Sequence, residues 1–124
     1  MIYTGYFAQV KKYRDAGLVT LSIARSARYY SGERFPVLAP PVEIINLSED
    51  DYIPRYFTCV LNKLNPLIIA EELKKYGENI VLLCHEKPSS FCHRQLVAGW
   101  LKDAGIHCEE FVVEKEKKQS LEFV

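Results

Sequence analysis

The sequence carries no surplus of charge, because its 16 Lys and Arg residues are balanced by 16 Asp and Glu residues. A chain without net charge has no overall field that attracts polyanions, so any affinity for phosphate or nucleic acid requires a local patch. The chain also lacks an apolar run near the roughly 18 residues that a transmembrane helix needs. These absences exclude a membrane-embedded protein and one that binds polyanions through its bulk charge.

Cysteine is scarce and irregularly spaced. The chain has four cysteines, Cys59, Cys84, Cys92 and Cys108, and their spacing does not resemble the disulfide framework of a small secreted protein. The first residues, from Met1 onward, have neither the basic start nor the long apolar core of a secretory signal. We therefore expect a cytoplasmic protein with reduced thiols.

The chain contains enough apolar residues to form the core of one domain. Apolar residues make up 48% of the 124 positions, and a chain of this length buries about two-thirds of its unfolded surface. Strand-like and helix-like segments alternate, which indicates a parallel sheet covered by helices. We predict a single three-layer α/β/α domain with a mainly parallel sheet over residues 1–113. A charged tail follows at 114–124, and its alternative is a strand that docks on a partner.

The local patterns predict where the elements lie. Asn65 followed by Pro66 is a strong helix start, and Gly17 and Gly77 are suitable helix stops. Residues 42–47 fit either a short strand or a helical turn, since six residues show no decisive period. The predicted strands are 2–4, 18–24, 79–84 and 107–113, and the predicted helices are 7–17, 50–64, 65–77 and 90–104.

The most informative segment is an apolar run that leads into a cluster of reactive side chains. The run begins at Ile80, and the cluster comprises Cys84, Glu86, Cys92, His93 and Arg94. We predict that this cluster lies on a strand-to-helix turn, where open α/β sheets bind ligands.

The expected chemistry of this turn centres on a thiol. A helix capped by Ser89 or Ser90 places Cys92 in its first turn, where the macrodipole lowers the pKa of a thiol. We predict Cys92 as nucleophile, His93 or Glu86 as proton carrier, and Arg94 as anion clamp.

The connection over residues 25–35 is the second notable feature. It contains three arginines interleaved with aromatic residues, a combination that pairs phosphates and stacks bases on single-strand binding surfaces. A solvated basic loop that packs through its aromatic side chains is the alternative. The residues predicted to bind substrate beside Arg94 are Arg25, Cys84, Tyr6, Arg28 and Tyr56.

Two rival interpretations use the same cysteines. Cys84, His85, Cys92 and His93 form a possible Cys2His2 set, but adjacent doublets are unlike the knuckles of zinc modules. We therefore expect neither a metal nor another cofactor, and we assign His85 a structural role because its strand neighbours are apolar. A disulfide between Cys84 and Cys92 requires Cα atoms within about 7 Å.

The motif resembles the signature of the domain of unknown function family 488. That signature is an apolar strand running into Cys-x-Glu, then five residues, then Cys-His-Arg, as in the segment from Cys84 to Arg94. Further similar features span nearly the whole chain: Tyr3 to Tyr6, Ile23 to Arg25, Leu38 to Pro40, Tyr52 with Tyr56, and Trp100-Leu101. Many members carry an acid where this chain has Ile23. The resemblance implies a three-layer α/β/α domain and brings no established reaction.

Three functions remain open at this point. The first is an enzyme with a cysteine-centred site that acts on an anionic, phosphate-bearing substrate such as a nucleotide or a nucleic acid. The second is a non-catalytic module that binds phosphate or nucleic acid through its arginines. The third is a thiol redox sensor. The sequence leaves the oligomeric state open and indicates no membrane partner.

Overall fold

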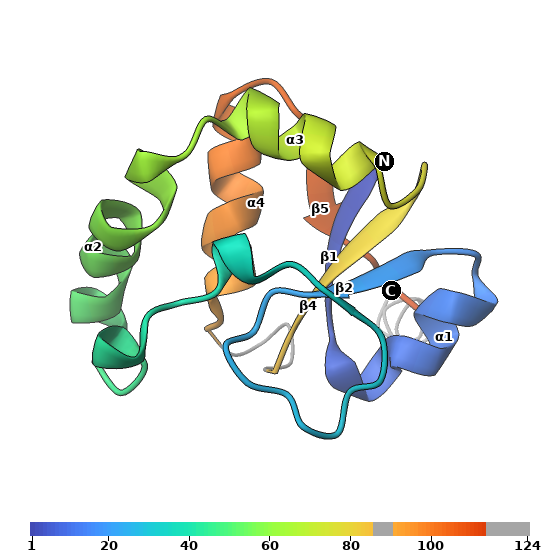
Figure 1. The fold of residues 1–124 in the computed structure, drawn as a ribbon, viewed down its shortest axis with the longest axis horizontal. Helices are drawn as coiled ribbons and strands as arrows, with labels where there is room; N and C mark the ends of the chain where they lie inside the picture. The colour runs from blue at the N-terminus through green and yellow to red at the C-terminus, as the bar shows by residue number, and fades with distance from the viewer. Residues whose placement is uncertain (86–90, 114–124) are drawn as a thin grey trace, which may run out of the picture.

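The sheet of this protein is entirely parallel. The computed structural model describes residues 1–85 and 91–113 (Figure 1). Its five strands lie in the order β3-β2-β4-β1-β5, with every neighbouring pair parallel. The α/β class predicted from the sequence is confirmed. The strands are β1 (Ile2–Tyr6), β2 (Val19–Ser22), β3 (Glu33–Arg34), β4 (Ile80–Cys84) and β5 (Cys108–Glu110).

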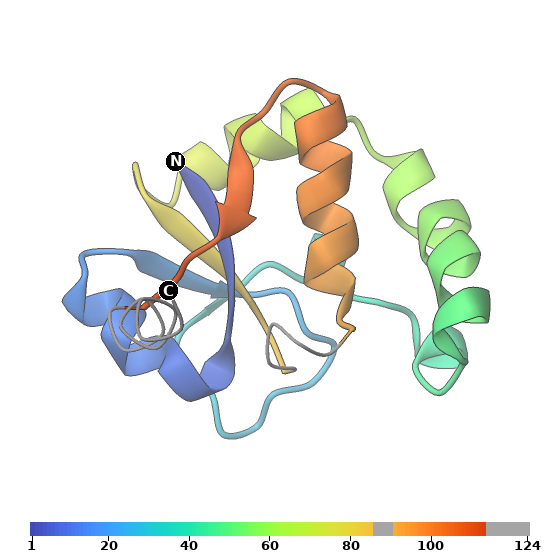
Figure 2. The same cartoon turned by 180° about the vertical axis from the view of Figure 1, so that it is seen from behind.

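Helices cover both faces of this sheet. One face carries α1, and the other carries α2, α3 and α4, of which α4 lies against β1 and β5 (Figure 2). Short 3-10 turns join the longer elements. The helices are α1 (Val10–Asp15), α2 (Glu49–Cys59), α3 (Pro66–Lys74) and α4 (His93–Asp103), and the 3-10 turns are η1 (Phe7–Gln9), η2 (Pro36–Leu38), η3 (Val42–Ile44) and η4 (Leu61–Lys63).

The central strand β4 shows why both faces need a cover. All five of its residues are buried, and successive side chains of a strand point to opposite faces. Ile80 and Leu82 belong to the core shared with α2, α3 and α4, whereas Val81 and Leu83 belong to the core on the α1 side. The same alternation directs Cys84 toward the α4 side of the sheet.

The strand order places a ligand crevice between β2 and β4. The chain leaves β2 toward β3, its neighbour at one edge, and leaves β4 toward β5 at the other edge. Connections that diverge from adjacent parallel strands open a crevice beyond their carboxyl ends, and open α/β sheets bind ligands there. In this protein β2 ends at Ser22 and β4 ends at Cys84, so the residues directly after these two positions border the crevice.

Several boundaries differ from the sequence prediction. The predicted helix at 90–104 begins at His93, because Cys92 is its N-cap with an extended backbone (φ −149°, ψ 152°). The Cys92 amide donates to Gln95 Oε1 at 3.3 Å. Cys92 therefore precedes the first turn instead of lying within it, and the predicted caps Ser89 and Ser90 lie outside the described residues.

Two further elements correct or resolve expectations. Strand β3 was not expected, because its two residues, Glu33 and Arg34, are exposed and show no apolar alternation. It is held by pairing with β2. The ambiguous segment 42–47 contains the single turn η3, not a strand. The predicted tail at 114–124 lies outside the described residues, and in the described part of the chain no helix is long and apolar enough to cross a bilayer.

Candidate functional site

Two cysteines and one histidine meet at the carboxyl edge of the sheet. Cys84 ends β4, Cys92 caps α4, and His93 is the first residue of that helix. One ligand atom from each, the two Sγ atoms and an imidazole nitrogen, lie within 4.8 Å of one another. Nδ1 of His93 is 3.2 Å from Sγ of Cys84 and 3.8 Å from Sγ of Cys92. The fold thus gathers three of the predicted site residues.

The two sulfurs are joined in a disulfide. The Cα atoms of Cys84 and Cys92 are 6.7 Å apart, within the range that a disulfide spans. This bond differs from the expectation that every thiol is reduced. The other two cysteines, Cys59 and Cys108, are free thiols. The site therefore has an oxidised form, and reduction of the bond yields two thiols beside one imidazole.

A backbone carbonyl fixes the tautomer of His93. Nε2 of His93 is 2.7 Å from the carbonyl oxygen of Ile23, which follows β2. A carbonyl only accepts hydrogen bonds, so Nε2 carries the proton and the lone pair of Nδ1 faces the sulfurs. Burial lowers the pKa of His93 to about 4, although the bond to Ile23 opposes this shift. The imidazole is consequently neutral at pH 7, and its Nδ1 is unprotonated.

Tyr56, which we predict from the sequence to bind substrate, lies against the imidazole of His93. Its ring meets that of His93 edge-on, with centroids 5.5 Å apart, and stacks on Tyr52. The hydroxyl of Tyr56 donates to the carbonyl of Leu38 at 2.6 Å, and the side chain is fully buried. Tyr56 therefore supports the orientation of His93 from the inner face of α2, and its own side chain is not exposed to a substrate.

Arg94 points away from the sulfurs. Its guanidinium is fully buried and pairs with the carboxylate of Glu110 on β5 through two bonds of 3.0 and 3.2 Å. The same group lies over the ring of Tyr6, 5.9 Å from its centroid. This arrangement favours a structural role for both residues over the predicted roles, which are anion clamp for Arg94 and substrate binding for Tyr6.

A pocket of about 310 Å³ borders the cluster. Arg25 and Ser26, which follow β2, line it together with the two cysteines and both histidines of this edge. Arg25 is exposed, and among the described lining residues it alone carries a permanent charge. The predicted site residue Arg28 is also exposed but is not in this lining. The predicted proton carrier Glu86 lies outside the described residues.

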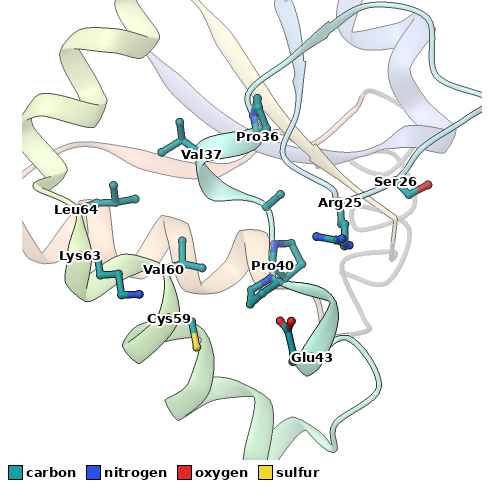
Figure 3. A pocket seen from close by; sticks show the side chains of 12 residues that line it. Arg25, Ser26, Pro36, Val37, Pro40, Glu43, Cys59, Val60, Lys63 and Leu64 are labelled. Carbon is teal, nitrogen blue, oxygen red and sulfur yellow. The ribbon is translucent and has the colours of Figure 1, made fainter.

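A larger pocket of about 860 Å³ adjoins the first and shares Arg25, Ser26 and Pro40 with it. Figure 3 shows Arg25 and Glu43 on one side of this pocket and Lys63 on the opposite side. The rest of its lining is mainly apolar. The crevice beyond the sheet edge therefore extends past the sulfur cluster.

His85, for which the sequence predicts a structural role, also lines the smaller pocket. This residue is exposed, and its Nε2 donates to the carbonyl of Ser26 at 2.8 Å. The hydroxyl of Tyr29 donates to its Nδ1 at 2.6 Å. His85 thereby ties the connection after β2 to the end of β4 and lines the smaller pocket. The signal that was available is its place directly after a buried strand.

Comparisons of this chain with family models, curated proteins and solved structures give no match. The resemblance to the family 488 signature therefore stays a prediction from the motif.

Proposed function

We propose that this chain is an enzyme whose reacting group is a thiolate of the pair Cys84 and Cys92, with His93 as its base. The observation that carries the proposal is the position of Nδ1, 3.2 Å from one sulfur and 3.8 Å from the other. A thiol, a base within reach and a third group that orients the base are the parts of an activated nucleophile. The third group here is the carbonyl of Ile23.

The proton transfer follows from the tautomer. In the reduced site Nδ1 of His93 accepts the thiol proton as the sulfur attacks, and the N–H of Nε2 continues to donate to the carbonyl of Ile23. Cys92 is the attacking sulfur in this proposal, because it caps a helix of 11 residues whose free amides stabilise a thiolate. Cys84 is then the neighbouring thiol that shares the base.

An anionic substrate suits the charge of the pocket. Arg25 is exposed at the wall of the smaller pocket and also lines the larger one, where the charges of Lys63 and Glu43 offset each other. A substrate that carries phosphate or carboxylate would pair with Arg25 while its reacting atom approaches the sulfur of Cys92. Arg94 acts in this proposal through the packing of α4 on β5 and not through contact with the substrate.

Alkylation rates test the proposed nucleophile. The protein is reduced with a phosphine, freed of metal with a chelator and treated with iodoacetamide at pH 7, and each cysteine is followed by peptide mass spectrometry. We expect Cys92 to react at least about 10-fold faster than Cys59, since a thiolate and not a thiol is the nucleophile. Cys92 is 7% exposed, whereas Cys59 is half-buried, so simple access predicts the opposite order.

The His93→Gln variant is the matched control for this experiment. It should slow alkylation of Cys92 by about 10-fold or more, the scale of a lost general base, and leave Cys59 unchanged. Cys108 is an internal reference, because burial raises its pKa to about 12. A rate at Cys92 equal to or below that at Cys59 would rule out an activated thiol at this position.

The disulfide favours a second candidate, a thiol redox protein. Two thiols this close can be oxidised by a peroxide, with each thiol losing one proton and one electron and the peroxide leaving as two waters. Cys84 and Cys92 would then cycle between dithiol and disulfide. His93 serves this reaction too, because it generates the thiolate that begins it.

Mass measurement after mild oxidation tests the redox candidate. We expect the reduced chain to lose two hydrogens with one equivalent of hydrogen peroxide. Cleavage after Glu86 should then give one cross-linked peptide pair containing Cys84 and Cys92. Cys84→Ser should abolish that loss, and Cys59→Ser should not affect it. Formation of a sulfinic acid on Cys92 without any cross-link would remove the redox candidate and leave the nucleophile proposal intact.

A further inference from the structure

We propose that the reduced site binds a thiophilic divalent cation, of the zinc type, through Sγ of Cys84, Sγ of Cys92 and Nδ1 of His93. The inference concerns the same side chains as the proposed function and rests only on reduction of the disulfide, not on catalysis. It replaces the four-residue set considered from the sequence, since both ring nitrogens of His85 are engaged by Tyr29 and Ser26.

The spacing of the donor atoms fits a tetrahedral ion. Zinc binds sulfur at about 2.3 Å and imidazole nitrogen at about 2.0–2.1 Å, so neighbouring ligands of a tetrahedral site lie about 3.5–3.8 Å apart. Nδ1 of His93 is 3.2 Å and 3.8 Å from the two sulfurs. Once reduced, the sulfurs of Cys84 and Cys92 have to separate to a similar distance, and their Cα atoms, 6.7 Å apart, leave room for this.

The orientation of the histidine is already that of a metal ligand. Histidines that bind metals usually donate their other ring N–H to a carboxylate or a backbone carbonyl, which fixes the ring and the tautomer. Nε2 of His93 makes this bond to the carbonyl of Ile23 at 2.7 Å. The edge-on contact of Tyr56 with the ring supports the same orientation. Nδ1 is therefore presented to the ion without rearrangement.

The charge of the complex suits a buried site. Cys84, Cys92 and His93 are all less than a tenth exposed, and an unpaired charge buried there would be costly. A divalent cation displaces one proton from each thiol, so the ion and two thiolates with a neutral imidazole have no net charge. Opening the site beforehand requires a dithiol or phosphine reductant, which supplies two electrons to the disulfide, while the two sulfurs take up two protons.

Three protein ligands leave one position of the ion open. The pocket of about 310 Å³ is lined by all three ligand residues and by Arg25. A water or an anionic ligand that enters this pocket would therefore complete the coordination, as in open zinc sites with three protein ligands. Metal binding and thiolate attack use the same sulfur electron pairs, so the ion would block alkylation of Cys92.

Titration with zinc alone tests the inference. The full chain is reduced with a phosphine under anaerobic conditions, and zinc is added in competition with a chromophoric chelator. We expect one ion per chain, release of about two protons per ion at pH 7, and binding at least about 100-fold weaker in the oxidised protein. Cobalt(II) should give the intense visible bands of a tetrahedral site together with thiolate charge-transfer absorption.

Variants locate the ligands. Cys84→Ser, Cys92→Ser and His93→Gln should each weaken zinc binding by about 100-fold or more, and Cys59→Ser should not change it. The comparison of reduced with oxidised wild type needs no substitution, so it decides the matter even if a variant fails to fold. Absence of binding to the reduced wild type, or binding that depends on Cys59, would overturn the inference. The alkylation experiment is performed without metal, so either proposal can fail while the other stands.

Discussion

Replacing Arg94 with alanine is expected to lower the free energy of unfolding by about 3 kcal/mol, the low end of the cost of breaking a buried ion pair, because Glu110 is 26% exposed. The side chain is fully buried, and two hydrogen bonds join it to Glu110. Its loss leaves a carboxylate without its guanidinium, and also a cavity where α4 packs on β5. Urea unfolding followed by circular dichroism measures the change, provided that the m-value is unaffected.

Two further variants make this result specific. Arg28→Ala removes an exposed arginine and should change the stability by no more than about 0.5 kcal/mol. Arg94→Lys keeps the charge but loses the planar fork, so it should recover only part of the stability. If Arg94→Ala unfolds like the wild type and instead loses affinity for phosphate, Arg94 is the anion clamp of the sequence prediction, and the structural role is wrong.

Acidification is expected to destabilise the fold through His93. The pKa of His93 is about 4 in the folded protein, lowered mainly by burial from its ordinary 6.5. Between these two values the histidine is protonated in the unfolded chain and neutral in the folded one. The contribution of the neutral His93 to the free energy of unfolding is therefore fully present above about pH 6.5 and is lost as the pH falls toward 4. The full shift corresponds to about 3 kcal/mol. Unfolding free energies of wild type and His93→Gln, compared from pH 7 to 4, measure it.

The difference between the two proteins isolates the imidazole, because carboxylates titrate in the same pH range in both. His107→Gln is the matched control, since His107 is exposed and its side chain lies 3.8 Å from Glu109 at the surface. This variant should retain the acid sensitivity of the wild type. An NMR titration of His93 with a midpoint near 6.5 would show that burial does not lower its pKa, and would contradict this prediction.

Much of the fold could be predicted from local patterns. The run from Ile80 to Cys84 is apolar at every position because β4 is covered on both faces. The helix start at Asn65 and Pro66 could also be predicted, because an N-cap residue and a proline in the first turn act only on the backbone of adjacent residues. Asn65 accepts a hydrogen bond from the amide of Leu67, as such a cap requires.

The partners of the reactive side chains could not be predicted in this way. The sequence predicts Arg94 as an anion clamp, but its carboxylate partner Glu110 lies 16 positions away on β5. His93 finds its orienting carbonyl at Ile23, 70 positions earlier. Such pairings depend on which strands become neighbours, and β2 and β4 are adjacent although α2 and α3 separate them in the chain.

The amino-acid sequence by itself determined a parallel α/β domain with sulfur and imidazole at the carboxyl end of one strand, because apolar period and helix caps are properties of short segments. Only the tertiary structure decided which of these groups meet. It joined Cys84 with Cys92, turned Nδ1 of His93 toward them, and committed the guanidinium of Arg94 to Glu110. The physical reason is that direction and burial of a side chain are set by packing between elements distant in sequence, which no local pattern encodes.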